Sequence, residues 1–377
     1  MRRTVQTKAK QADTEEDIQG LFNEKENLSL GNRPEDLSSD TRRIMSKFIP
    51  FYNNNSHLAP LLDVAREIHS AFQLPAKYQF LNIIHGGTKL KNMLTGSPFV
   101  SEAIGSDLPD YCTYVKGVND AFRIYYYGQL PSSLLTNLLK IFSYFKSVNN
   151  IHVIIYPSQF KKYLPPSTGS VLGSYAINSG YADCSSNKIV IWRQEEVLKV
   201  LIHELLHFVV KYDGQFATYA NGLFNYKGTD NPIEAVVESL TVFIHTILFL
   251  SDVPFNPNLM IRALLLEISW SEYQCCKILR HYGATRFEQI LKKDGDVVIE
   301  QTTSVLSYFV IKYLLLCRLD EVWNKVWNKG EVSFSKILSE SINTNKAKIN
   351  FLLADWPWNN RGFMSRTLRF SLLEKSY

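Results

Sequence analysis

Apolar residues follow two kinds of pattern along the chain, and the change from one to the other lies near residue 194. Between residues 121 and 193, short runs rich in β-branched and aromatic residues predict strands, with one helix that a proline introduces. The expected strands cover 121–130, 151–157, 171–183 and 188–193, and the expected helix covers 131–148. Turn-forming residues at 184–187 join the last two strands into a hairpin.

Helical periodicity dominates most of the remaining chain. Apolar residues there recur every three or four positions, as on the buried face of a helix. Helices are expected over 57–74, 194–212, 232–251, 257–281, 302–317 and 333–343. A half that contains a sheet, followed by a helical half, predicts the α+β class.

Composition divides the chain into four expected parts. The first 48 residues hold nine basic and nine acidic side chains and few aromatics, which is typical of a disordered, charged tail. We expect this tail at 1–48, a helical or irregular segment at 49–118, an α/β part at 119–230 and an α-helical part at 231–377. With 45% hydrophobic residues, the chain after the tail can bury a sizeable core.

The charge and the cysteines narrow the choice of partner and compartment. Lys and Arg number 41 against 36 Asp and Glu, and the net charge of +5 is spread along the chain without a dense basic block. A nucleic-acid partner is therefore not expected. The five cysteines are widely spaced and form no CxxC pair, so free thiols in a reducing compartment are expected.

The apolar runs predict neither a secretory signal nor a membrane span. Residues 1–20 carry charges throughout and lack the apolar region of a signal peptide. The longest apolar stretch, 235–250, is interrupted by Glu238 and His245 and is shorter than the roughly 18–20 clean apolar residues of a span. We expect a cytoplasmic or otherwise intracellular protein, whose oligomeric state the sequence leaves open.

The helix expected at 194–212 carries three polar side chains inside an apolar run. The stretch VLIHELLHFVV places His203 and His207 four residues apart, with Glu204 directly after the first. Residues four apart share one helix face, so both imidazoles can bind one metal ion. The HExxH pattern is typical of zinc metallopeptidases, in which the glutamate polarises a zinc-bound water. The competing interpretation makes the two histidines hydrogen-bonded core residues without a metal.

A pair of acidic residues lies on the next expected helix. Asn231 as cap and Pro232 in the first turn introduce this helix, and Glu234 and Glu238 lie four residues apart on one of its faces. Catalytic zinc usually takes three protein ligands, so one carboxylate would complete the set while the other orients a ligand histidine. The alternative is two glutamates on a solvated helix face.

HExxH followed by an ExxxE helix resembles the gluzincin metallopeptidases, the clan that includes thermolysin. The resemblance covers roughly residues 120–250 and implies a zincin-like fold, with a small mixed sheet over the HExxH helix. It also implies Zn²⁺ and five site residues: the ligands His203, His207 and Glu234, the general base Glu204, and Glu238 as the partner of a ligand histidine. The 26 residues between His207 and Glu234 exceed the spacing of the best-known members, so Glu238 stays open as the ligand instead.

The same resemblance implies a peptide or protein substrate bound along an edge strand. In this clan an antiparallel edge strand before the HExxH helix pairs with the substrate backbone, and residues 177–193 are placed to supply it. Gly180, Tyr181 and Ala182 are the expected contact residues. A plain hairpin with a turn glycine is the alternative. The stretch 179–207 also resembles predicted metallopeptidases of large DNA viruses.

A zinc peptidase also needs a hydrogen-bond donor for the oxyanion of the tetrahedral state. We expect Tyr308 in this role, since its apolar helix contains an otherwise unexplained polar stretch, with a core tyrosine as the alternative. The other candidates are His245, His281 and Tyr212. A metzincin is excluded, because the chain continues HFVVKYDG and lacks the third histidine of HExxHxxGxxH.

The sequence therefore predicts an intracellular zinc-dependent peptidase of gluzincin type. Its main rival is a catalytically inactive zincin fold retained for binding or scaffolding. A third possibility is a helical core with buried polar pairs and no metal. Glu204 favours the enzyme, because a purely structural zinc site has no need of an acid beside it.

Overall fold

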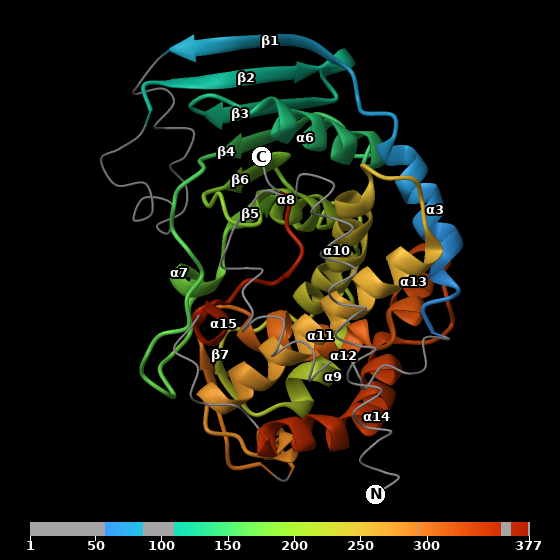
Figure 1. Cartoon of the computed structure of the whole chain (residues 1–377). Helices are drawn as coiled ribbons and strands as arrows, with labels where there is room; N and C mark the ends of the chain where they lie inside the picture. Colours follow the sequence, from blue (N-terminus) through green and yellow to red (C-terminus); the bar gives the residue numbers. More distant parts are fainter. Residues whose placement is uncertain (1–56, 86–108, 294, 356–362, 376–377) are drawn as a thin grey trace, which may run out of the picture.

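A six-stranded mixed sheet forms one end of the protein (Figure 1). The computed structural model describes residues 57–85, 109–293, 295–355 and 363–375, so the tail expected at 1–48 lies outside the described residues. The strands are β1 (Tyr78–His85), β2 (Tyr111–Gly117), β3 (Phe122–Tyr127), β4 (Ile151–Ile155), β5 (Gly180–Asp183) and β6 (Lys188–Ile191). Their order in the sheet is β1-β2-β3-β4-β6-β5.

Only the central strands of the sheet run parallel. β4 is parallel to both β3 and β6, whereas β1, β2 and β5 each pair antiparallel. The alternation of side chains along the strands puts Ile124, Val153 and Ile189 in register on one face, where they join the main core. β5 forms an antiparallel edge of the sheet, and the hairpin of β5 and β6 precedes the HExxH helix in the chain, as expected.

Helices make up most of the rest of the molecule. Their bounds are α3 (Leu61–Phe72), α6 (Ser132–Tyr144), α7 (Ser174–Ile177), α8 (Val197–Leu206), α9 (Gly214–Leu223), α10 (Ile233–Leu250), α11 (Pro257–His281), the π-helical turn η4 (Leu306–Ile311), α12 (Lys312–Leu316), α13 (Leu319–Trp327), α14 (Phe334–Ala354) and α15 (Phe363–Arg366). Short 3₁₀ turns lie at Val118–Asp120 and Phe287–Ile290. The mixture of sheet and helices confirms the α+β class.

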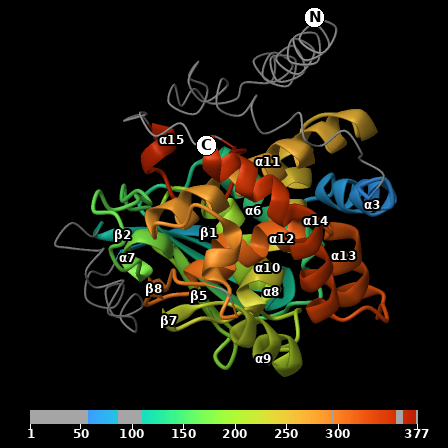
Figure 2. The same ribbon diagram turned by 90° about the horizontal axis from the view of Figure 1, so that it is seen from below.

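α10 is the central helix of the core. It packs against α8, α12, α11 and α3, and Figure 2 shows it in the middle of the helical half. By length and composition α10 could cross a membrane, yet 94% of it is buried inside the fold, as the core helix of a globular protein also is. The absence of a membrane span therefore stays a prediction.

The structure differs from the predicted elements in the segment before the hairpin. Residues 171–183 were expected to form one strand, but Ser174–Ile177 is a short helix and only Gly180–Asp183 joins the sheet. Leu172 instead bridges to Gln301, next to the small parallel pair of β7 (Tyr226–Gly228) and β8 (Ile299–Gln301). Leu172 and β5 thus pair with different sheets, and the short helix α7 turns the chain from one to the other.

The sheet also extends beyond the expected α/β part. The segment 49–118 was expected to be helical or irregular, yet it contains β1 and β2, and β2 pairs with β3 across the proposed boundary. Likewise β8 lies within the part expected to be helical. The largest hydrophobic cluster includes residues from α3, the sheet and the later helices, so the main core crosses the expected boundaries between parts.

Candidate metal centre

His203 and His207 project from the same face at the end of α8. α8 lies between the sheet strands β5 and β6 on one side and α10 on the other. His207 is the residue that ends the helix and keeps helical dihedral angles, so the spacing of four residues brings the two rings together. Their Nε2 atoms are 3.2 Å apart.

Glu234 supplies the third atom of the centre from the first turn of α10. Its Oε2 lies 3.2 Å from His203 Nε2 and 3.5 Å from His207 Nε2. Burial favours the neutral carboxyl, but hydrogen bonds with the two imidazoles outweigh it and hold the pKa of Glu234 well below its usual value. The other oxygen, Oε1, accepts a hydrogen bond from the side-chain Nδ2 of Asn231 at 3.3 Å.

These three atoms form a triangle with sides of 3.2, 3.2 and 3.5 Å. Zinc is bound by imidazole nitrogen and carboxylate oxygen at about 2.0–2.2 Å, so two ligands of a tetrahedral ion lie roughly 3.3–3.5 Å apart. The triangle has the size of one face of that tetrahedron, and its three corners are the donor types that zinc takes. The residues present therefore fit a zinc ion with one coordination position left open.

Glu238 orients His203 from behind. Its Oε2 lies 2.8 Å from His203 Nδ1, and its Oε1 is in close contact with the Lys199 ammonium. The carboxylate is fully buried, which favours the neutral form, yet Lys199 and His203 hold the pKa of Glu238 well below its usual value. An ionised carboxylate accepts the Nδ1 proton and directs the Nε2 lone pair outward, as the partners of zinc-bound histidines do. This contact favours Glu234 over Glu238 as the ligand.

The acidic neighbours of His203 favour its protonated form. Burial disfavours the charged imidazolium, but hydrogen bonds to Glu234 and Glu238 raise the pKa of His203 to about 10. If His203 Nε2 carried no proton, its lone pair would face the lone pairs of His207 and Glu234. These lone pairs repel each other unless a proton or a metal ion lies between them.

Glu204 faces the centre from the next position on α8. One ligand atom from each of His203, Glu204 and His207 lies within 4.8 Å of the others, a spacing suited to holding a metal ion. Glu204 is 5% exposed, and burial raises its pKa while the nearby histidines oppose the rise. A carboxylate with a raised pKa is suited to accept and return a proton near neutral pH.

The edge strand β5 passes directly over Glu204. A Cβ atom on Gly180 would lie 2.7 Å from Val200 Cγ1 and 3.0 Å from Glu204 Oε1, so only glycine allows this approach. Ala182 packs on the same side, against the main core. Tyr181 points to the opposite face of the sheet and lies 6.3 Å from the Trp192 ring, so its side chain does not face the centre.

Tyr308 joins the centre from the π-helical turn η4. Its hydroxyl donates a hydrogen bond to Glu234 Oε2 at 3.2 Å, and its ring lies 6.1 Å from that of His203. Burial and the neighbouring carboxylates raise the pKa of the phenol well above its usual value, so it remains a neutral donor. π-helical turns are uncommon and occur frequently at functional sites.

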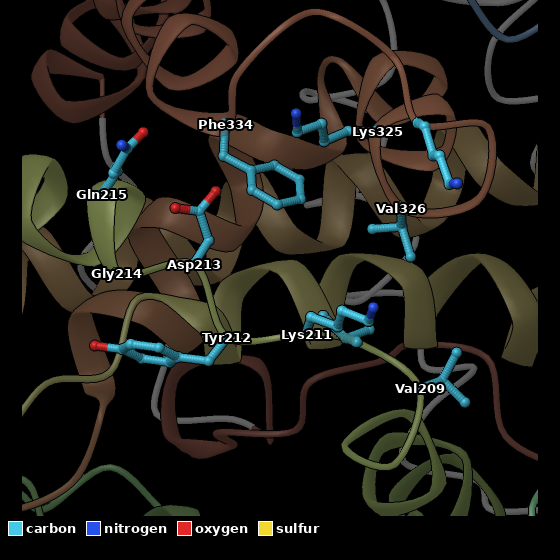
Figure 3. A pocket seen from close by; sticks show the side chains of 11 residues that line it. Val209, Lys211, Tyr212, Asp213, Gly214, Gln215, Lys325, Val326 and Phe334 are labelled. Atoms are coloured by element: carbon cyan, nitrogen blue, oxygen red, sulfur yellow. The ribbon is translucent and has the colours of Figure 1, made fainter.

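The other candidate donors lie elsewhere. His281 interacts with the Ser170 carbonyl oxygen at 2.9 Å, and His245 lies about two turns beyond Glu238 along α10. Tyr212 is 72% exposed and lines a pocket of about 650 Å³ beyond the end of α8 (Figure 3). That pocket is lined by residues 209–215 together with Lys325, Val326, Lys329 and Phe334, and none of them is a residue of the centre.

Lys199 is a residue of the site that sequence reasoning missed. It lies one turn before His203 on α8, is 1% exposed, and forms an ion pair with Glu238. A lysine in an apolar helix, four residues before a motif histidine, is a detectable signal, because a buried ammonium needs a buried partner. The sequence does not show which of the acidic residues that partner is.

Comparison with known proteins adds no family to this description. No protein-family model, no curated protein and no solved structure matches the chain.

Proposed function

We propose that the protein is a zinc-dependent peptidase of gluzincin type. The observation that carries the proposal is the triangle of His203 Nε2, His207 Nε2 and Glu234 Oε2, which has the dimensions of a zinc site. Glu204 beside it and Glu238 behind it complete the pattern that the resemblance implies. A site of ligands alone would not need the buried acid Glu204 facing it.

Each residue has a role in peptide hydrolysis that follows from its position. Bound zinc would polarise the scissile carbonyl and lower the pKa of a water molecule. Glu204 accepts the proton of that water and later passes it to the leaving amine. The Tyr308 hydroxyl, which donates to Glu234 Oε2 in the structure, would turn its hydrogen bond to the oxygen that gains negative charge. β5 offers its free edge to the substrate backbone, and Gly180 keeps that edge close to Glu204.

The first test is the zinc content per chain, measured by elemental mass spectrometry. We expect one zinc in the wild type, a loss in His203→Ala and Glu234→Ala, and retention in the control His152→Ala, whose ring contacts Arg123 away from the centre. Glu238→Ala should keep a weakened site, because Glu238 touches His203 only through Nδ1. A wild type without zinc would exclude the proposal.

The second test is cleavage of a quenched-fluorescence peptide library. We expect cleavage by the wild type, and loss of at least a hundredfold in Glu204→Gln while one zinc is retained. Tyr308→Phe should lower kcat by about 10²-fold at unchanged zinc content. Zinc without cleavage in the wild type would contradict the peptidase and favour the alternative, a zincin fold that serves binding or scaffolding.

A further inference from the structure

The ring of Phe370 lies among three buried lysine side chains. Phe370 belongs to the segment Thr367–Lys375, which follows α15 and passes α8 inside the fold (Figure 1, dark red). The ring centroid is 3.8 Å from Lys162 Nζ, 4.7 Å from Lys199 Nζ and 5.5 Å from Lys312 Nζ. Significant cation–π contacts occur about once per 70–80 residues, so three on one ring are exceptional.

The segment holds this ring in a fixed place. The Arg369 carbonyl accepts a hydrogen bond from the Trp270 indole at 3.1 Å, and the Phe370 carbonyl accepts one from Lys312 Nζ at 3.2 Å. Next along the chain, the Ser371 amide donates to Glu196 Oε1 at 2.7 Å. The backbone on both sides of the ring is thus bound to the core, and the ring itself is only 6% exposed.

Two chains of contact lead from Phe370 to the metal centre. The first runs through Lys199, whose ammonium lies over the ring and contacts Glu238, which in turn contacts His203 Nδ1 at 2.8 Å. The second runs through Tyr308, whose ring centroid is 5.1 Å from that of Phe370 and whose hydroxyl meets Glu234. The Phe370 ring therefore contacts two side chains, Lys199 and Tyr308, that lead to two different residues of the centre.

We propose that Phe370 is a positioning residue of the metal centre. Its aromatic face holds the Lys199 ammonium against Glu238, which fixes the ring of His203, and its contact with the tilted Tyr308 ring fixes the phenol. The inference rests on the proposed zinc site and adds a residue that lies outside the metal-binding motif. An aliphatic side chain would fill the space but would not attract the ammonium, so Lys199 and the residues it supports would become less ordered.

The test compares Phe370→Leu with Phe334→Leu in the full chain. Both variants remove a buried ring, and Phe334 packs on Phe216 without contact to the centre. The measured quantities are the zinc dissociation constant, by competition with a chromophoric chelator from pH 6 to 8, and the unfolding midpoint. We expect the zinc dissociation constant to rise about tenfold in Phe370→Leu and to stay within twofold in Phe334→Leu, at similar losses of midpoint.

A second series keeps the test decisive even if Phe370→Leu does not fold. Fluorinated phenylalanines at position 370 keep the shape of the ring and weaken its negative face step by step. Zinc affinity should then fall in the order of fluorine content. Unchanged affinity in Phe370→Leu, or no trend in the fluorinated series, would overturn the inference while leaving the zinc site intact. A wild type that binds no zinc would instead overturn the proposed function, and this inference with it.

Discussion

Gly180 is the residue at which the edge strand β5 approaches Glu204. A methyl group there would contact Val200 and Glu204 at 2.7 and 3.0 Å, so Gly180→Ala must displace β5 or the carboxylate. We expect the variant to retain one zinc, because no ligand is touched, and to lose about 10²-fold in kcat/KM, because a small misplacement of a catalytic group is enough. Peptide cleavage and zinc content measured on the same preparation check both parts.

Gly222→Ala is the matched control for this substitution. A Cβ atom on Gly222, in α9, would meet nothing within 4 Å. Cleavage should be unchanged in that variant. Equal activity of Gly180→Ala and the wild type would show that the strand edge can move without effect on Glu204.

Asp230 gives the metal-free protein a defined pH dependence. Burial raises the pKa of Asp230 to about 6, although hydrogen bonds from Ser307 and Gln301 oppose the rise. The folded state therefore keeps this proton to a higher pH than the unfolded state does. Its contribution to stability is present below the unfolded pKa of about 4 and is lost as the pH rises through 6.

Between pH 5 and pH 7.5 the free energy of unfolding of the wild type should accordingly fall by about 1.4 kcal/mol relative to that of Asp230→Asn, which lacks the carboxyl group. Urea unfolding of the chelator-treated proteins measures it. Asp183→Asn is the control, since hydrogen bonds from Ser185 and Ser186 lower the pKa of Asp183 to about 2, outside this range. A difference between Asp230→Asn and the wild type that does not vary with pH would contradict the assignment.

Spacing, together with the resemblance to the gluzincins, pointed to most residues of the centre. Two intervals of four residues placed His203 with His207 and Glu234 with Glu238, because residues four apart share one face of a helix. Phe370 gave no such signal. Its role depends on contacts between segments more than a hundred residues apart, which a local pattern does not contain.

At the scale of elements, long helices with a clear apolar period were predicted best, although α14 runs to Ala354, well past its expected end at 343, and short elements such as α9 were missed. α10 and α11 lie within a residue or two of their expected bounds. β1 lies in the segment 49–118, which was expected to be helical or irregular. It is exposed along most of its length and thus lacks the alternation that marks a half-buried strand. One strand was predicted over 171–183, because the sequence pattern does not show that the two ends of this segment pair with different sheets.

α9 illustrates an element fixed by a single cap. The Asp213 carboxylate accepts a hydrogen bond from the Phe216 amide at 2.9 Å. Asp213→Ala should lower the free energy of unfolding by about 1 kcal/mol, whereas Asp213→Asn, which keeps an acceptor, should lose less than half of that. Urea midpoints compare the two variants. An equal loss in both would show that the charge of Asp213, and not its acceptor oxygen, supports the helix.

At the scale of the whole molecule, the centre joins two helices of the core. His203 and His207 come from α8, and Glu234 comes from α10, so bound zinc would cross-link them. With free zinc at 100 times its dissociation constant, the expected gain in stability is about 2.7 kcal/mol. A chelator should therefore lower the thermal unfolding midpoint of the wild type by several degrees, as scanning calorimetry would show.

Two variants make this measurement specific to the centre. His203→Ala should unfold at the same temperature with and without the chelator. His281→Ala, which alters a histidine bound to the Ser170 carbonyl, should keep the chelator effect of the wild type. A chelator effect that persists in His203→Ala would place the stabilising metal somewhere else.

The buried course of the segment Thr367–Lys375 has a consequence for the rate of folding. Its backbone is bound by side chains that lie far earlier in the chain: the Ser371 amide meets Glu196 across 175 positions. A contact of such long range forms only after the entropy of closing a large loop has been overcome, which slows folding. We expect α8 and α10 to associate early and this segment to dock late, so that a newly made chain would hold the proposed metal firmly only after the last step of folding.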